Sequence, residues 1–346
     1  MRWKKILYGL FVTILFLNVD LFFRNEPRCE EAVIELKISQ FGSPSWPQQT
    51  EVLEPWARKI EKLTNGRIKF SLFPNEILGK AVEQYDIALK GIADIVLGLP
   101  DYTPGRFPLV SCIKLPFLGV QNAEKASLVL WRLYQKYLKD EFKDVKVLWM
   151  FCNGPFQLHT INKKVKTLQD LKGLRIRMSD PTSAKALELL GAVTVSCTVI
   201  DGYNLMKEGK LDGIVIPWEG ALDFKYLELC KYHTVINIYA MPFYVVMNKE
   251  RYESLPADIK KTIDDNSGEA MAALAGRVMD NGDIKGERFA QARGDFIYTL
   301  PKAERERWKK ITMPLGDKWV EEMQAKGLPG QEVLTYVVDL FIQIQE

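Results

Sequence analysis

The chain has 346 residues, of which 47% are hydrophobic and 26% are charged, with a formal net charge of +3 at pH 7. This is an ordinary globular composition with enough chain for two domains. Residues 1–28 contain five basic and two acidic side chains, so the remainder is close to neutral. The sequence therefore lacks the basic field that indicates a nucleic-acid partner.

The first residues predict an export signal. Arg2, Lys4 and Lys5 form a positively charged segment, and the apolar run 6–17 that follows is too short for a comfortable membrane span. We expect residues 1–32 to be a signal peptide or N-terminal export segment, and the protein to act in the periplasm. The cleavage-site pattern is poor, so an uncleaved segment that tethers the protein to the membrane stays an alternative.

Alternating strands, amphipathic helices and Gly/Pro loops divide the rest of the chain into two α/β units. Strands are expected at 33–39, 67–73, 93–98, 145–152, 156–161, 174–178, 192–196, 212–216, 232–238 and 242–248. Helices are expected at 48–63, 79–90, 122–138, 182–190, 201–207, 218–226, 256–293, 301–326 and 331–345. We expect the chain to cross between the units at Asn153-Gly154-Pro155 and to return near residues 240–242.

Catalytic and metal-binding patterns are sparse. There are only two histidines, and the chain has no G-x-S-x-G, H-E-x-x-H, P-loop or G-x-G-x-x-G motif. The five cysteines are widely spaced, without C-x-x-C. We therefore predict no cofactor and no metal, and a binding protein rather than an enzyme. An exported enzyme acting on organic acids would need His159, Asp101 or Glu219 as its general base, and a ligand-sensing module is a further alternative.

One stretch, Leu171 to Pro181 (LKGLRIRMSDP), combines a strand with a helix start. Side chains alternate along a strand, so Arg175 and Arg177 share one face. Arg177 ends the strand just before a helix N-terminus, where the guanidinium fork can hold both oxygens of a carboxylate. Two solvated arginines on an edge strand are the simpler alternative.

An ordered set of motifs resembles the solute-binding proteins of TRAP transporters, of the DctP type. Residues 65–79 (NGRIKFSLFPNEILG) and 89–94 (LKGIAD) are similar to their G-x-I…P…L-G…G-x-x-D run, and residues 170–177 (DLKGLRIR) to their D-L-K-G-L-K-I-R motif. Further segments fit in order and spacing: 108–118, 190–192, 209–213 and 248–256. The resemblance covers about residues 33–300.

The resemblance implies an α/β, two-lobe periplasmic-binding-protein-like fold of class II type, with a hinge and a long lobe-spanning helix. We expect lobe I to comprise 33–154 and 242–288, lobe II to comprise 155–241 and 289–346, and the ligand cleft to lie between them. It also implies a monomeric receptor that delivers an organic acid to the small and large membrane subunits of a TRAP permease. Arg177 is then the residue that binds the ligand's carboxylate.

The chain departs from the family pattern in ways that predict a drier site. Val215 and Ile216 stand where dicarboxylate and sialic-acid receptors tend to have Glu-Asn, and Pro155-Phe156-Gln157 stands where sialic-acid receptors carry a further arginine. We therefore expect an apolar or aromatic monocarboxylate, or a 2-oxo acid, as the ligand. The candidate ligand-binding residues beside Arg177 are Tyr102, Phe117, Phe156, Gln157, His159, Trp218, Glu219 and Phe243.

Overall fold

The computed structural model describes residues 32–179 and 181–344, and for Pro181 and Thr182 the backbone only. All but the last residue of the predicted export segment 1–32 thus lies outside the described residues. Residues 35–346 form one compact unit, and the fold and the site belong to this unit.

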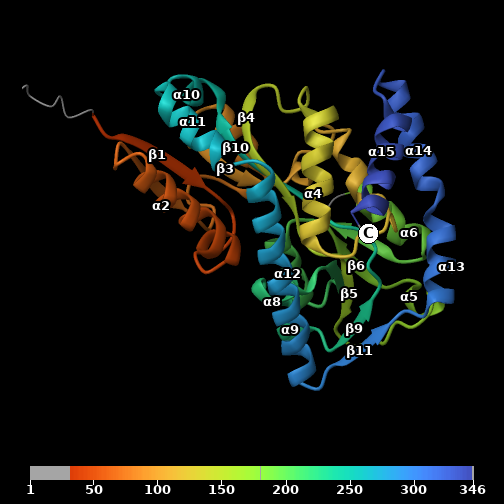
Figure 1. Ribbon diagram of the computed structural model, residues 1–346. Coiled ribbons are helices and arrows are strands. Elements are labelled where there is room, and N and C mark those ends of the chain that lie inside the picture. Colours follow the sequence, from red (N-terminus) through yellow and green to blue (C-terminus); the bar gives the residue numbers. More distant parts are fainter. Residues whose placement is uncertain (1–31, 180, 345–346) are drawn as a thin grey trace, which may run out of the picture. The chain divides into compact units, whose positions relative to one another are not determined.

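The described residues form eleven strands and fourteen α-helices (Figure 1). The strands are β1 (Ile34–Ser39), β2 (Ile68–Phe73), β3 (Ile95–Gly98), β4 (Val145–Cys152), β5 (Gln157–Thr160), β6 (Arg175–Met178), β7 (Val193–Ser196), β8 (Gly213–Ile216), β9 (Tyr232–Val235), β10 (Pro242–Asn248) and β11 (Phe296–Thr299). The helices are α2 (Glu54–Leu63), α3 (Gln84–Leu89), α4 (Ala123–Leu133), α5 (Leu168–Leu171), α6 (Pro181–Leu189), α7 (Val199–Lys207), α8 (Trp218–Asp223), α9 (Tyr226–Leu229), α10 (Lys249–Glu253), α11 (Ala257–Asp265), α12 (Glu269–Ala292), α13 (Lys302–Thr312), α14 (Pro314–Ala325) and α15 (Gly330–Gln343). Shorter 3-10 or π-helical turns are η1 (Gln48–Leu53), η2 (Ala81–Glu83), η3 (Pro100–Tyr102), η4 (Val110–Lys114) and η5 (Tyr134–Leu138).

The strands form two mixed sheets. The first sheet has the order β2-β1-β3-β10-β4, and the second has the order β11-β9-β5-β8-β6-β7. Each sheet contains one strand that runs antiparallel to its neighbours. In the first sheet β10 runs antiparallel to β3, and in the second sheet β5 runs antiparallel to β8. All seven residues of β10 are buried, which fits its continuous apolar sequence because helices cover both faces of such a sheet.

The chain crosses between the sheets where the sequence predicts it. The segment after β4 leads into β5 of the second sheet, and the segment after β9 leads back into β10 of the first sheet. These two crossings lie side by side: Asn153 N donates to the Met241 carbonyl (3.2 Å), and Phe156 N donates to the Tyr239 carbonyl (2.8 Å). Paired crossing strands of this kind form a hinge.

Helix α12 connects the two halves of this unit. It packs against α4 and β4 beside the first sheet and against α8 beside the second (Figure 1). We expected one helix over 256–293, but the structure has two, α11 and α12. The break falls at Gly268, which has a φ of 76° and donates its N–H to the Leu148 carbonyl (2.8 Å). Glycine adopts this left-handed conformation at little cost.

The packing of the C-terminal helices differs in one part from what we expected for lobe II. Strand β11, which the sequence reading missed, joins the second sheet, and α13 contacts α6. However, α15 packs against α4 and α14, which places these two helices beside the first sheet. Trp319, Val337 and Leu340 belong to the same buried cluster as Phe107 and Tyr244. Residues 314–343 therefore bury their apolar faces in the core around the first sheet, not in that of the second.

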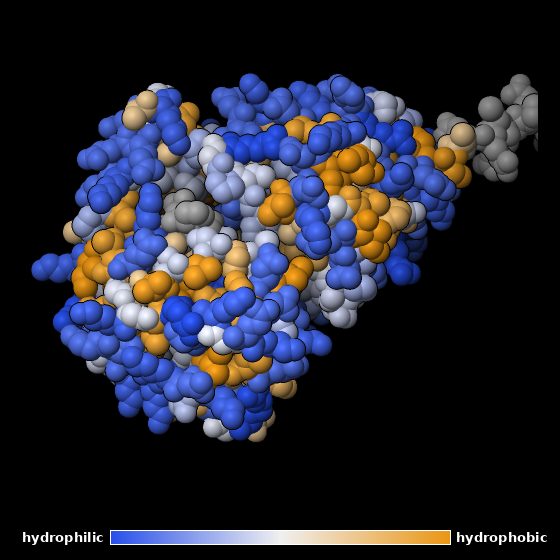
Figure 2. Space-filling model, turned by 180° about the vertical axis from the view of Figure 1, so that it is seen from behind, coloured by the Kyte–Doolittle hydropathy of each residue, from blue (hydrophilic) through white to orange (hydrophobic). Residues whose placement is uncertain are grey.

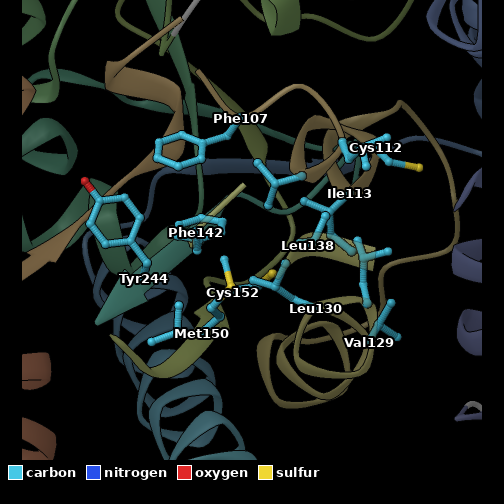
Figure 3. Close-up of a cluster of buried hydrophobic side chains, with 14 of the residues drawn as sticks. Phe107, Cys112, Ile113, Val129, Leu130, Leu138, Phe142, Met150, Cys152 and Tyr244 are labelled. Atoms are coloured by element: carbon cyan, nitrogen blue, oxygen red, sulfur yellow. The ribbon is translucent and has the colours of Figure 1, made fainter. Parts of the chain in front are cut away.

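Aromatic stacking stabilises the core beside the first sheet. Phe107 and Phe142 stack with ring centroids 4.5 Å apart, and Tyr244 of β10 lies edge-on to Phe142 (Figure 3). On the outside, hydrophilic side chains cover most of the face seen in Figure 2, with hydrophobic side chains in separate patches between them. Within the described residues, no helix combines the length and hydropathy needed to cross a membrane.

Candidate ligand-binding site

A pocket lies where the ends of the two sheets face each other. The carboxyl ends of parallel strands are the usual place for ligands in α/β folds, and here residues at or after the carboxyl ends of β1, β3, β4, β6 and β8 line the pocket. The antiparallel strands β5 and β10 contribute their amino ends instead. The space between the lining atoms, including the open mouth, is about 420 Å³.

Two groups of side chains form the walls. The side of the first sheet contributes mostly rings: Phe41, Trp46, Leu99, Tyr102 and Phe243. The side of the second sheet contributes Phe156, Arg177, Val199, Ile216, Glu219 and Phe224. The walls are therefore predominantly aromatic and aliphatic, with one basic and one acidic side chain among the described residues that line them.

Arg177 is the basic side chain of the pocket. It is only 2% exposed. Its Nε and Nη2 groups both donate to the Cys197 carbonyl, at 3.0 and 2.5 Å. Among the described residues it makes no ion pair with a carboxylate. Because a buried charge without a partner is costly and a guanidinium has five N–H donors, Arg177 is set up to bind an anion.

The surroundings of Arg177 hold it in place. Tyr102 lies beside the guanidinium, and its hydroxyl accepts a hydrogen bond from Val199 N (3.4 Å). Burial raises the pKa of Tyr102, although the Arg177 charge opposes this shift, so the phenol is neutral near pH 7. A Cβ at Gly202 would come within 2.8 Å of Arg177 Cγ and 2.7 Å of the Tyr226 hydroxyl. Glycine at position 202 therefore leaves the space that the arginine occupies.

Arg175, two residues earlier on β6, has a different role. It faces outward and forms an ion pair with Asp212, with Nη2–Oδ1 at 2.7 Å and Nε–Oδ2 at 3.0 Å. Arg175 is the first residue of β6 and Arg177 lies near its carboxyl end, so their places along the strand separate a surface ion pair from a pocket arginine.

Glu219 is the acidic side chain of the pocket, and a hydrogen bond joins it to the opposite wall. Trp46 Nε1, from the loop after β1, donates to Glu219 Oε1 at 2.7 Å. Burial raises the pKa of Glu219 well above its ordinary value, and the negative charges of Asp223 and Asp283 raise it further. Burial therefore disfavours the ionised form of Glu219, and Arg177 carries the one basic charge among the described residues that line the pocket.

Aromatic rings line the space between these two polar groups. The Trp46 ring lies 5.4 Å from Phe41 and 6.3 Å from Phe243. Phe243 stacks on Phe151 behind it, at 4.9 Å and 12° between the ring planes. Phe156 stacks on Tyr239 at 4.6 Å. The rings are therefore supported from behind and present flat faces to the pocket.

Five of the residues selected from the sequence line the pocket: Tyr102, Phe156, Arg177, Glu219 and Phe243. Gln157, His159 and Trp218 do not. Side chains alternate along a strand, so Gln157 and His159 of β5 point to the side opposite Phe156, which lines the pocket. The Gln157 amide bonds with Asn237 and with the Ile236 N–H, which secures the crossing segment.

His159 and Trp218 belong to a buried structural cluster. His159 Nδ1 lies 2.8 Å from His233 Nδ1, and its Nε2 lies 3.0 Å from the Ile216 carbonyl. The Trp218 ring packs against both histidines, at 4.8 and 4.9 Å. Burial and the neighbouring His233 lower the pKa of His159, so it is neutral. The expectation that His159 and Trp218 contact the ligand is thus corrected: they support the wall from behind.

Two other candidates also lie elsewhere, and several wall residues were missed. Phe117 has its N–H bonded to the Ile238 carbonyl (2.6 Å) and lies outside the pocket. Asp101 is buried in an ion pair with Lys114 (2.7 Å). Phe41 and Trp46 were missed, although they follow the carboxyl end of β1. The rule that selected Tyr102 after β3 applies to them equally.

The chain was compared with known protein families. Residues 38–323 match the family model described as bacterial extracellular solute-binding protein, family 7. The chain belongs to this family. The resemblance to TRAP-transporter solute-binding proteins is thereby confirmed. A curated member, the C4-dicarboxylate-binding periplasmic protein DctP of Rhodobacter capsulatus, is 23% identical over 322 residues, 89% of this chain and 93% of that protein.

Solved structures of family 7 proteins share the fold. A TRAP solute-binding protein from Rhodoferax ferrireducens, in complex with copurified benzoate, is 34% identical with a TM-score of 0.87 and covers 90% of this chain and 99% of its own. A marine metagenome protein in complex with 3-hydroxybenzoate is 33% identical (TM-score 0.88; 91% and 100% covered). One from Bordetella bronchiseptica with bound (R)- and (S)-mandelate is 27% identical (0.84; 90% and 99%). The two-lobe fold of family 7 is thus confirmed for this chain.

Proposed function

We propose that this solute-binding protein captures an aromatic monocarboxylate and delivers it to the membrane subunits of a TRAP permease. The observation that carries the proposal is Arg177: a buried guanidinium, without a carboxylate partner among the described residues, in a pocket walled by aromatic rings. The ligand's carboxylate supplies the missing partner, because a bidentate pair with arginine satisfies both charges.

The charge of the pocket supports one carboxylate rather than two. Arg177 is the only basic residue among the described residues that line it. A second carboxylate would lie against Ile216 and other apolar side chains, or near Glu219 and its acidic neighbours, without a cation to offset its desolvation.

The shape of the walls supports a flat ligand body. Trp46, Phe156 and Phe243 border the space beside Arg177, and aromatic rings pack favourably on one another. The structural neighbours agree with this: benzoate, 3-hydroxybenzoate and mandelate, found in proteins 27–34% identical to this chain, are each one carboxylate joined to an aromatic body.

Capture then follows from the two-lobe fold. The carboxylate binds Arg177, and the lobes close about the paired crossing segments, as in other hinged binding proteins. Closure brings Trp46 to Glu219 and Tyr102 to Val199 across the pocket and excludes water, which strengthens the ion pair. We place lobe I at 33–154 and 242–288 with α14 and α15, lobe II at 155–241 with β11 and α13, and the protein in the periplasm as a monomer.

A receptor fits the pocket better than an enzyme acting on the same acids. His159 lies outside the pocket and is held by His233 and a carbonyl, and Asp101 is paired with Lys114. Glu219 is engaged by Trp46. No general base within the described residues therefore stands free beside Arg177.

A ligand screen tests the proposal. The purified protein is heated with aryl carboxylates, 2-oxo acids, dicarboxylates, sugar acids and neutral sugars, and a ligand raises the melting temperature by mass action. We expect benzoate and related aryl monocarboxylates to stabilise the protein. Stabilisation by dicarboxylates, sugar acids or 2-oxo acids alone would contradict the proposal that the ligand is aromatic. Chemical turnover of a bound acid would contradict the proposal that the protein is a receptor.

A further inference from the structure

Glu219 places a hydrogen-bonding group in a wall that is otherwise apolar on the side of α8. Its carboxyl group is 3% exposed and lines the pocket. Oε1 accepts the indole N–H of Trp46 (2.7 Å), and the backbone N–H of Glu219 donates to Asp283 Oδ1 (2.7 Å). A carboxyl oxygen has two lone pairs, so Oε1 keeps acceptor capacity after it has bound Trp46.

Glu219 lies further along the direction of the strands than Arg177 does. Strand β8 runs beside β6 with Ile214 opposite Arg177. Ile216 is therefore about 7 Å further along the strand direction, and Glu219 lies in the helical turn that follows. A ligand whose carboxylate is bound at Arg177, with its ring between the aromatic walls, reaches Glu219 with the far edge of the ring.

The surroundings of Glu219 determine which group it accepts. Asp223, one turn later on α8, and Asp283 of α12 face it, while Lys285 of α12 acts on Asp223. The negative charge of Asp223 raises the pKa of Glu219, so the two carboxyl groups do not both ionise readily. The remaining acceptor on Glu219 suits an O–H donor, whereas an anionic group of the ligand would meet the negative charge shared by this pair.

We propose that Glu219 determines specificity by accepting a hydrogen bond from a hydroxyl group on the ring edge distant from the carboxylate. The preferred ligand is thus a hydroxyaryl carboxylate substituted at the meta or para position. This inference rests on the proposed function and adds to it the chemical class of the ring substituent. The Trp46 N–H, which comes from the other side of the pocket, completes this contact only when the pocket is closed.

Calorimetric titration of the full-length purified protein tests the inference with four probes: benzoate and its 2-, 3- and 4-hydroxy derivatives. We expect the 3- or the 4-hydroxy acid to bind about tenfold more tightly than benzoate, because its hydroxyl adds a buried hydrogen bond to the second lone pair of Glu219 Oε1. The 2-hydroxy acid is the matched ligand control: its hydroxyl lies beside the carboxylate, away from Glu219, and brings no such gain.

Variants assign the preference to the side chain. Glu219→Met removes the acceptor at similar volume and should reduce the ratio of the benzoate Kd to the hydroxybenzoate Kd to about one. Glu219→Gln keeps a carbonyl acceptor and should keep a ratio above one. Glu228→Met, an exposed carboxylate on the neighbouring helix α9, is the control and should leave the ratio unchanged.

The outcomes separate this inference from the proposed function. Equal binding of benzoate and the 3- and 4-hydroxy acids by the unmodified protein overturns the role of Glu219 and leaves the receptor for aromatic acids intact. Persistence of the preference in Glu219→Met has the same meaning. Absence of binding for all four acids overturns the proposed function and this inference with it. The ratio in the unmodified protein decides the matter even if Glu219→Met does not fold.

Discussion

Asp280 and Asp283 lie one turn apart on α12, and each caps a helix beside a different sheet. The Asp280 carboxylate accepts the N–H groups of Ala123 (2.6 Å) and Glu124 (3.0 Å) at the start of α4. Asp283 accepts the Glu219 N–H (2.7 Å) at the start of α8. Negative groups at helix N-termini are stabilising, so α12 holds both halves of the unit through two adjacent caps.

The cap at Asp283 predicts an unusual pH dependence of stability. Burial raises the pKa of Asp283 from 3.8 to about 7, and bonding to Glu219 N–H opposes this only in part. Because the folded-state pKa exceeds the unfolded one, the folded protein binds more protons between pH 4 and 7. Asp283 therefore contributes stability at low pH that is lost as pH rises through about 7.

The measurement is urea unfolding of the unmodified protein and of Asp283→Asn between pH 5 and 7.5. The free energy of unfolding should fall with rising pH more steeply in the unmodified protein, by up to about 1.4 kcal/mol per pH unit. Glu141, whose pKa burial also raises to about 7, contributes equally to both proteins and cancels. Identical slopes would show that Asp283 does not titrate in this range.

Gly154 is predicted to be necessary for this cap. A Cβ at position 154 would lie far inside contact distance of the Asp283 carboxylate, so Gly154→Ala must displace the capping group. We expect a loss of about 1–2 kcal/mol, the usual value of an N-cap, in denaturant unfolding. In an Asp283→Ala background the same substitution should cost almost nothing, and additive losses would refute the coupling.

Gly202 is predicted to control affinity through Arg177. The methyl group of Gly202→Ala meets Arg177 Cγ and the Tyr226 hydroxyl, and the shifted guanidinium should bind benzoate about tenfold or more weakly, because misplaced binding groups lose most of their effect. Gly316→Ala is the control, since its added methyl would meet only Leu334 at 3.8 Å. Equal affinity of the two variants would contradict the packing argument.

Trp46 is predicted to slow ligand release. Trp46→Phe keeps a ring but removes the N–H bonded to Glu219 across the pocket. Because this bond crosses the pocket, its loss should raise the dissociation rate of benzoate about tenfold with little change in association, as measured by ligand-exchange NMR. Trp56→Phe loses an equivalent N–H bond, to the Asn266 carbonyl, outside the pocket. Its exchange rate should match the unmodified protein.

The elements predicted most accurately from the sequence are those that are buried, and therefore apolar, along their whole length. The bounds of β4 and β10 were predicted without error because both strands are buried along their whole length. Arg177 was found because strand alternation and a following helix start are local signals. The four-residue β11 was missed because Phe296 to Thr299 is only half-buried and lies beside β9, far away in the sequence.

The parts of the site that were missed depend on contacts between distant segments. Trp46 and Glu219 are separated by 173 positions, and no local pattern pairs them. The orientation of His159 and Gln157 follows from partners at the end of β8 and on the second crossing. The split of 256–293 at Gly268 had a local signal, because a glycine after Asn-Ser commonly ends a helix.

The central claim is that Arg177 binds the carboxylate of an aromatic acid, and calorimetric titration with benzoate tests it most directly. Arg177→Ala should weaken binding by about two to three orders of magnitude, because the ligand's buried charge loses its partner. Arg175→Ala, on the same strand but paired with Asp212 at the surface, should bind as the unmodified protein does. Binding of benzoate by Arg177→Ala at unmodified affinity would contradict the account.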